Sequence, residues 1–238
     1  MRICAHQPTY LPSLHLLNKI SFCDTFILLG HCQFVKQSWH VRNNIRSGKD
    51  SMRLTVPIRK TGPIRKGDKF GQNIANTPID GDHWKRKHLR AIAENYGKRP
   101  YFKDYYPEIE AIIQQPHESL AQLNNALLLK FMAWCALAPK VYYSEDYNIE
   151  GQKNQMLINL CQEFGANEYV SNPGARSYLD EPLFKKHNIQ HFWQEFTHPT
   201  YDQGKAFIPN LSVIDLLFNM GPASGELVRN AGHLVASA

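Results

Sequence analysis

At 238 residues the chain has the length of one large domain, and with 43% hydrophobic and 20% charged residues it can form a packed core, which excludes a wholly disordered protein. Its longest apolar runs are too short to cross a bilayer and its N-terminal segment is not a signal peptide, so we expect a soluble cytoplasmic protein without a membrane partner. The net charge of +6 favours an anionic small-molecule ligand, and because no long basic tract or nucleic-acid motif is present, nucleic acid is not the expected partner.

The first part of the chain alternates short apolar runs with helical patterns. Residues 2–5 (RICA) predict a buried strand, residues 14–22 a helix and residues 25–29 (TFILL) a second strand, which together have the size of one βαβ unit. Residues 52–58 (MRLTVPI) predict a further strand. Residues 59–82 are rich in Gly, Pro, Lys and Arg, which indicates a basic loop insertion.

The second part continues the alternation. Apolar residues at helical spacing predict helices over residues 84–96, 119–135, 153–164 and 211–219. Strands are predicted over residues 140–144, 168–172 and 189–196. Strands that alternate with helices favour an α/β fold. We therefore expect a mainly parallel, Rossmann-like sheet flanked by helices, with an additional helical and loop portion, in a single domain over residues 1–238.

The five cysteines and eleven histidines show no pattern typical of a structural site. No two cysteines have C-x-x-C spacing, and no histidine cluster has the spacing of metal ligands. We expect buried free thiols and no metal site.

The segment HQPTYLP ends the first predicted strand abruptly, because proline fixes φ and lacks a backbone donor. Ligand-binding groups of α/β proteins lie in the segments that follow strands, which makes His6, Gln7, Tyr10 and His15 candidates. If the first helix begins near Ser13, its free N–H groups face this loop. The alternative is that Tyr10 packs in the core while the prolines only shape a turn.

The segment QFVKQSWHVRNNI combines cationic, amide and aromatic side chains. Its candidate binding residues are Gln33, Lys36, Trp39, Arg42 and Asn43. A Lys and an Arg beside an aromatic ring suit an anion attached to a planar group or a sugar ring. The alternative is a solvated basic loop with Trp39 in the core.

The segment VSNPGARSYLDE contains a strong turn at Asn-Pro-Gly, whose glycine allows a close approach of backbone to a ligand. Ser171, Arg176 and Tyr178 would then point toward a shared site. A plain turn followed by a capped helix is the alternative.

The segment THPTYDQGKAFIPNLSVIDLLFN supplies His198, Tyr201, Gln203 and Asp215. A histidine before a proline is more often structural than catalytic. Asp215 stands inside an apolar run, and a buried carboxylate must be paired. Helix capping, or the orientation of a histidine or arginine, would satisfy it.

These segments, in this order, resemble the WbqC-like protein family. The matching pieces are HQPTYLP, D-x-F, QFVKQSW-x-x-RNNI, LTVPI, W-x-x-KHL, YVSNPGARSYLD and HPTYDQGKAFIPNLSVIDLLFN-x-G. The resemblance implies a bacterial, enzyme-like protein of surface polysaccharide (O-antigen) or related biosynthesis. The chain departs from the family pattern at Gly30, where an acidic residue is common, and at Ser13, His15, Leu16 and Asn172.

Three functions follow as hypotheses. The first is a transferase or ligase that acts on a nucleotide- or phosphate-activated small molecule. The strand, proline loop and histidine at a helix start are similar to the phosphate-binding loop of nucleotidyltransferases and pantothenate synthetase, where imidazole and helix N-terminus stabilise developing charge. Lys36, Arg42 and Arg176 would supply the remaining positive charge.

The second hypothesis is an acyl or aminoacyl transferase that modifies an amino sugar with a thioester donor. His6 or His198 would be the general base, with Gln7, Tyr10 or Asn43 steadying the oxyanion. No serine or cysteine has a convincing nucleophile context, so transfer would be direct. The third is a non-enzymatic scaffold, against which the density of titratable groups on loops argues. A single site requires His6, His198, Arg42 and Arg176 to line one cleft.

Overall fold

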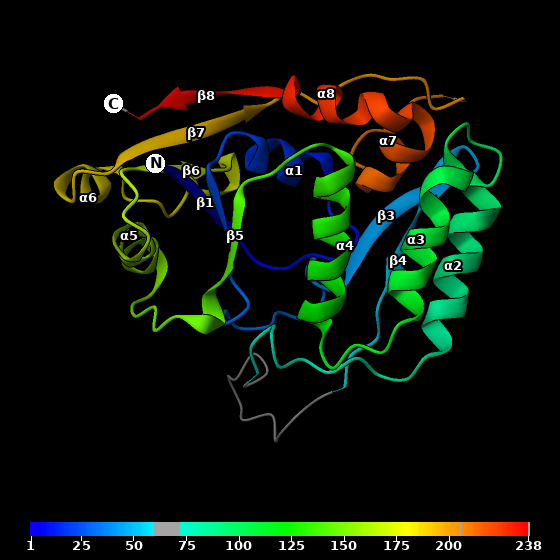
Figure 1. The fold of residues 1–238 in the computed structure, drawn as a ribbon, viewed down its shortest axis with the longest axis horizontal. Helices are drawn as coiled ribbons and strands as arrows, with labels where there is room; N and C mark the ends of the chain where they lie inside the picture. Colours follow the sequence, from blue (N-terminus) through cyan, green and yellow to red (C-terminus); the bar gives the residue numbers. More distant parts are fainter. Residues whose placement is uncertain (60–71, 205, 238) are drawn as a thin grey trace.

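The computed structural model describes residues 1–59, 72–204 and 206–237. In this part of the chain six strands form one sheet in the order β5-β2-β1-β6-β7-β8 (Figure 1). The strands are β1 (Arg2–His6), β2 (Thr25–Leu28), β5 (Lys140–Tyr143), β6 (Glu168–Ser171), β7 (Gln190–Phe196) and β8 (Gly232–Ala236). Neighbouring strands pair in parallel except β8, which is antiparallel to β7. The predicted α/β fold with a mainly parallel sheet is confirmed.

Helices cover both faces of this sheet. Alternate residues of each strand point to opposite faces, and the apolar residues on both faces are buried. Cys4 of β1 belongs to the core that includes residues of α1 (Leu14–Ser21). Its neighbours Ile3 and Ala5 belong to a second core, formed with α5 (Lys153–Glu163) and α6 (Glu181–Lys186). The connection from β1 to β2 therefore crosses one face, and those before and after β6 cross the other.

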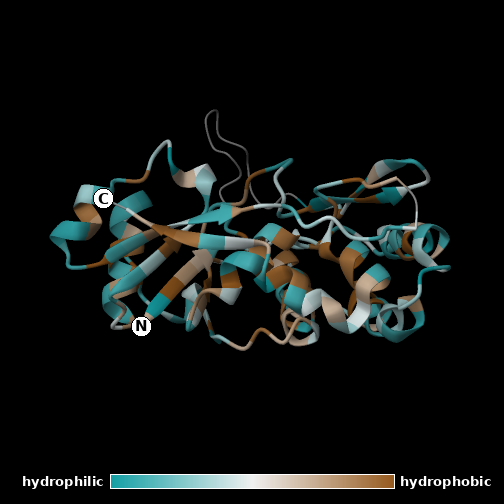
Figure 2. Cartoon of the chain, turned by 90° about the horizontal axis from the view of Figure 1, so that it is seen from above, coloured by the Kyte–Doolittle hydropathy of each residue, from teal (hydrophilic) through white to brown (hydrophobic). Residues whose placement is uncertain are grey.

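A helical portion extends the first core beyond the sheet. It contains α2 (His83–Tyr96), α3 (Phe102–Gln114), α4 (Leu120–Trp134), α7 (Val213–Met220) and α8 (Ser224–Arg229). The hairpin of β3 (Arg42–Ser47) and β4 (Asp50–Thr55) lies beside α2, α3 and α4 in Figure 1. Figure 2 shows apolar residues concentrated on the central strands and on the inner sides of these helices, with polar residues outside.

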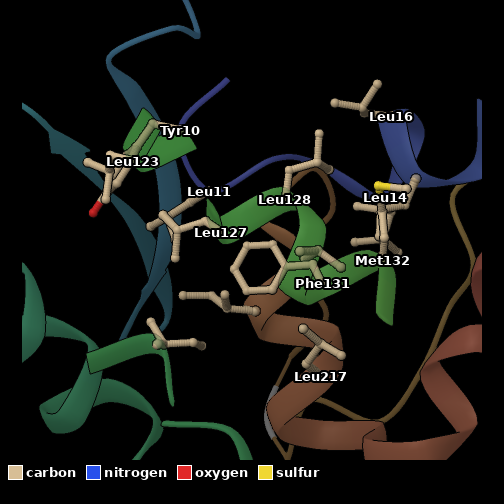
Figure 3. Packing of buried hydrophobic residues seen from close by; sticks show 14 of the residues in the cluster. Tyr10, Leu11, Leu14, Leu16, Leu123, Leu127, Leu128, Phe131, Met132 and Leu217 are labelled. Carbon is tan, nitrogen blue, oxygen red and sulfur yellow. The ribbon is translucent and has the colours of Figure 1, made fainter. Parts of the chain in front are cut away.

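The loop after β1 passes through this core. Tyr10 and Leu11 are fully buried, and Figure 3 shows them beside Leu123 and Leu127 of α4. The Tyr10 hydroxyl lies 2.9 Å from Nδ1 of His88 on α2. This placement corresponds to the alternative in which Tyr10 packs and the prolines shape the turn.

The apolar runs predicted β1, β2, β5, β6 and β7 and the helices α1, α2, α4, α5 and α7 to within a few residues, but other elements were missed. α3 contains Pro107, which is uncommon inside a helix, and β3 has the polar sequence RNNIRS. α8 and β8 were not predicted. Half of the predicted basic loop over residues 59–82, namely residues 60–71, lies outside the described residues. No helix in the described ranges is both long and apolar enough to span a membrane.

Candidate functional site

Two cavities meet at the carboxyl edge of the sheet, and His6 and Asn172 line both of them. The larger has a volume of about 590 Å³ and the smaller about 260 Å³. The other residues that line the larger cavity are Thr9, Ser13, Leu14, His15, Leu16, Trp39, Asn43, Phe196, His198, Asn210 and Leu211. The smaller cavity extends to the opposite side of β1, toward Met156 and Leu157 of α5.

The position of the cavities follows from the sheet topology. β1 continues to α1 on one face, whereas β6 leads to α6 on the other, so the two chain segments diverge after neighbouring strands. Backbone pairing between β1 and β6 extends over Arg2 with Glu168 and Ile3 with Tyr169. Beyond these pairs a crevice opens at the carboxyl ends, which is where open α/β sheets bind ligands.

His6 is the last residue of β1 and is held in one tautomer. Its Nδ1 lies 2.7 Å from the carbonyl oxygen of Gln7, and because a carbonyl only accepts, Nδ1 carries the proton of the neutral ring. Burial, followed by the charge of Lys19, lowers the pKa of His6 to about 3, and His15 and His40 act in the same direction. The ring is therefore neutral at pH 7, with the lone pair on Nε2 available to accept a proton.

His15 lies in the first turn of α1 and faces the larger cavity. Its ring meets that of Phe196 edge-on, with centroids 5.2 Å apart. Burial, with a further contribution from Lys19, lowers the pKa of His15 to about 4, so this ring is also neutral at pH 7. Ser13 at the N-cap of α1 makes no side-chain cap.

His198 reaches the same cavity from the segment after β7. Its Nδ1 lies 2.9 Å from the carbonyl oxygen of Pro199, which assigns the neutral ring the same tautomer as His6. Asn43 donates to the Leu11 carbonyl at 2.6 Å and accepts from the amide of Asn44 at 2.8 Å. The NH2 end of its amide thus holds the loop after β1 against β3, which makes Asn43 a positioning residue.

Trp39 forms the mouth of the larger cavity. It is 53% exposed, and its carbonyl accepts a hydrogen bond from the amide of Tyr10 at 3.0 Å. The aromatic side chain is therefore not in the core, unlike in the alternative interpretation of this segment.

Gln7, Ser171 and Tyr178 line the smaller cavity. Oε1 of Gln7 accepts from Nε2 of His40 at 2.8 Å, which connects the end of β1 to the loop before β3. At the adjoining end of β2, a Cβ on Gly30 would lie 2.5 Å from Oε2 of Glu145. A carboxylate from the segment after β5 thus occupies the space of a side chain at position 30.

Tyr201, Gln203 and Asp215 lie in a buried network away from both cavities. Asp215 accepts from the hydroxyls of Tyr201 at 2.9 Å and Tyr96 at 3.0 Å, and Nε of Arg46 lies 3.9 Å from its Oδ2. Arg46 also donates to Oε1 of Gln203. Burial raises the pKa of Asp215, and the hydroxyl donors oppose that shift. The three candidate residues therefore line neither cavity, and the buried Asp215 is paired, as its position in an apolar run indicated.

The predicted arginines do not join the histidines. Arg176 pairs with Glu195 of β7, and its guanidinium carbon lies 4.8 Å from the ring centre of Trp193 on the same strand. Arg42 begins the β3–β4 hairpin, paired with Thr55, and lines neither cavity. The expectation that His6, His198, Arg42 and Arg176 line one cleft is met by the histidines and is wrong for the arginines, because Arg176 packs on Glu195 and Trp193 of β7 and Arg42 lies in the hairpin.

Gln33 and Lys36 are exposed on the loop before β3, outside both cavities. Residues that the sequence did not single out include Lys19 and His40, which lie on or beside the smaller cavity. Within the described residues, no group of three or more His, Cys, Asp or Glu side chains could hold a metal ion.

The fold and site define an α/β protein whose candidate site lies at the carboxyl edge of a parallel sheet. A protein-family model for the WbqC-like protein family matches residues 7–227, so the chain belongs to this family. It is 33% identical to uncharacterized protein Rv1507c of Mycobacterium tuberculosis over 233 residues, which cover 96% of this chain and 97% of that protein. No solved structure matches the chain.

Proposed function

We propose that the protein is a biosynthetic transferase or ligase that acts on a nucleotide- or phosphate-activated small molecule, with His6 as the proton acceptor. The observation that carries the proposal is the position of His6, whose neutral ring lines both cavities. A group-transfer reaction needs two substrates that meet at one base, and two cavities that share a histidine provide such an arrangement.

The electrostatics of the site support an anionic substrate. The charge that lowers the pKa of His6 most, after burial, is that of Lys19, and the neighbouring His15 and His40 act in the same direction. A site that holds a buried positive charge and a histidine of low pKa binds a negatively charged ligand most favourably. Binding of such a ligand raises the pKa of His6 and makes it a stronger base.

In the proposed reaction the acceptor occupies the larger cavity, whose sides include Leu14, Phe196 and Leu211. Nε2 of His6 removes the proton of an acceptor hydroxyl or amine as that atom bonds to the activated centre of the donor. The phosphate or nucleotide of the donor leaves with the electron pair of the broken bond. A cytoplasmic step in surface polysaccharide (O-antigen) or related biosynthesis would use this chemistry.

A second candidate is acyl or aminoacyl transfer from a thioester to an amino sugar. One observation favours it: the residues lining the larger cavity include three histidines but no Lys or Arg. An uncharged acyl acceptor fits such a lining. His198, with the same tautomer as His6, is then an alternative base.

Thermal-shift measurements with ATP, CTP and UDP-sugars, set against coenzyme A thioesters, distinguish the two candidates. We expect nucleotide ligands to raise the Tm of the wild-type protein. His6→Asn keeps a donor toward the Gln7 carbonyl but lacks Nε2. The variant should therefore still bind the stabilising ligand, whereas the turnover number of the transfer reaction should fall at least about 100-fold. His83→Asn, on an exposed residue at the start of α2, is the matched control. Stabilisation by thioesters alone would contradict the first candidate.

A further inference from the structure

Lys19 lies at the point where β1 and β6 separate. The carbonyl oxygens of Arg2 and His6 accept hydrogen bonds from Asp24 and Leu29 on the β2 side. Because alternate residues of a strand point their backbone groups to opposite sides, the carbonyl of Ala5 points toward β6. It accepts from Nζ of Lys19 at 2.9 Å. The ammonium group thus takes the position that a backbone donor of β6 would have if the pairing continued.

The Lys19 charge is buried and incompletely paired. The residue is only 3% exposed, and its ammonium has three donors, of which one is used on Ala5. Burial lowers the pKa of Lys19, and the groups that oppose this are the thiols of Cys4 and Cys23. No carboxylate in the described part of the chain forms an ion pair with it. A buried ammonium without a counterion is costly, and Lys19 lines the smaller cavity.

Ser171 provides a second, independent feature of the same cavity. It ends β6, is 4% exposed and lines the cavity. Its hydroxyl forms no hydrogen bond with another described residue and is not one of the fully buried atoms left without a partner, so it is open to the cavity. Asn172 follows at the rim, and Lys153 lies exposed at the opening.

We infer that the crevice between β1 and β6 binds a phosphoryl group, with the Lys19 ammonium and the Ser171 hydroxyl as its buried ligands. The inference rests on the proposed function only where it assigns this phosphoryl group to the activated donor. A phosphoryl group carries several negative oxygen acceptors, which suit donors that converge from α1, from the end of β6 and from the cavity mouth. The bound anion also supplies the counterion that Lys19 lacks, directly beside His6.

Calorimetric titration with inorganic pyrophosphate tests this site. Lys19→Met keeps the length of the side chain and removes the charge, and it also leaves the Ala5 carbonyl without its Lys19 donor, so circular dichroism must verify that the variant folds. We expect Lys19→Met to weaken pyrophosphate binding about 10- to 100-fold. Ser171→Ala should weaken it about 3- to 10-fold. Lys103→Met, the same substitution on an exposed residue of α3, should leave the affinity unchanged.

Equal pyrophosphate affinity of wild-type protein and Lys19→Met would overturn the inference, as would an equal loss in Lys103→Met or tighter binding of malonate than of pyrophosphate. If Lys19→Met fails to fold, an unchanged affinity in Ser171→Ala overturns it. The experiment distinguishes failure of this inference from failure of the proposed function. Lys19-dependent pyrophosphate binding without any nucleotide stabilisation would support the anion site and reject the transferase. Equal nucleotide stabilisation of wild type and Lys19→Met would support the transferase and reject the anion site.

Discussion

The hydroxyl of Tyr201 donates a hydrogen bond of 2.9 Å to Oδ1 of Asp215, and both side chains are buried in the helical portion. This contact joins the segment after β7 to α7. Arg46 of β3 and Tyr96 of α2 meet the other oxygen of the same carboxylate. One buried aspartate thus connects four segments that are distant in sequence, and it positions the loop that carries His198.

Substitution of Asp215 should destabilise the protein strongly. Asp215→Ala leaves Arg46 buried without its partner and should lower the free energy of unfolding by about 3–5 kcal/mol, measured by urea denaturation. Tyr201→Phe removes one hydrogen bond to the carboxylate and should cost about 1–2 kcal/mol. Tyr178→Phe, on a 54% exposed residue, should change the value by less than about 0.5 kcal/mol. A loss of under 1 kcal/mol for Asp215→Ala would contradict the structural role of the network.

Stability should fall as the pH is lowered from about 6.5 to 4. Burial lowers the pKa of His15, His40, His88 and His191 to about 4. Since the unfolded chain then binds more protons than the folded one below pH 6.5, the stability present above that pH is lost on acidification.

Each histidine that stays neutral in the folded protein contributes at most about 1.4 kcal/mol per pH unit to the slope of the unfolding free energy in this range. Urea denaturation at intervals of half a pH unit measures the slope, and His191→Gln should reduce it. Stability that stays flat or rises between pH 6.5 and 4.5 would contradict the buried neutral histidines.

Lys19→Met should raise the pKa of His6. The charge of Lys19 is one of the causes that lower this pKa, second to burial, so its removal should move the value upward by a measurable part of the shift. Titration of the histidine ring carbons by NMR follows His6 directly, with His6→Asn to assign the signal. An unchanged pKa would show that the two groups do not interact.

Much of the fold could be predicted from the sequence because its sheet strands are short apolar runs and its long helices have apolar stripes. β3 could not, since its buried residues include Asn43 and Arg46, whose partners lie far along the chain. α3 was missed because Pro107 argues against a helix that tertiary packing of Tyr105, Ile109 and Ile113 nevertheless stabilises.

For the candidate site, the sequence placed His6, Gln7 and Ser171 at the ends of predicted strands, and these residues line the smaller cavity because the carboxyl edge of the sheet collects such positions. The cationic residue at the crevice was not found, because Lys19 stands within an amphipathic helix where a lysine is typical of the solvated face. Arg42 and Arg176 had suitable chemistry, but only the three-dimensional structure shows that they point elsewhere. Spacing in sequence gives residue types near a site and not the direction of their side chains.

The most direct measurement of the central claim, that His6 is a neutral base in a site built for an anion, is an NMR titration of its ring nitrogens with and without pyrophosphate. In the free protein we expect Nδ1 to be protonated and Nε2 unprotonated down to at least pH 5, in accord with the pKa of about 3. Saturation with pyrophosphate should raise the pKa of His6 by about one unit or more, because an anion beside the ring favours its protonated form. A free-protein pKa near 6.5, or a pKa that does not rise when pyrophosphate binds, would contradict it.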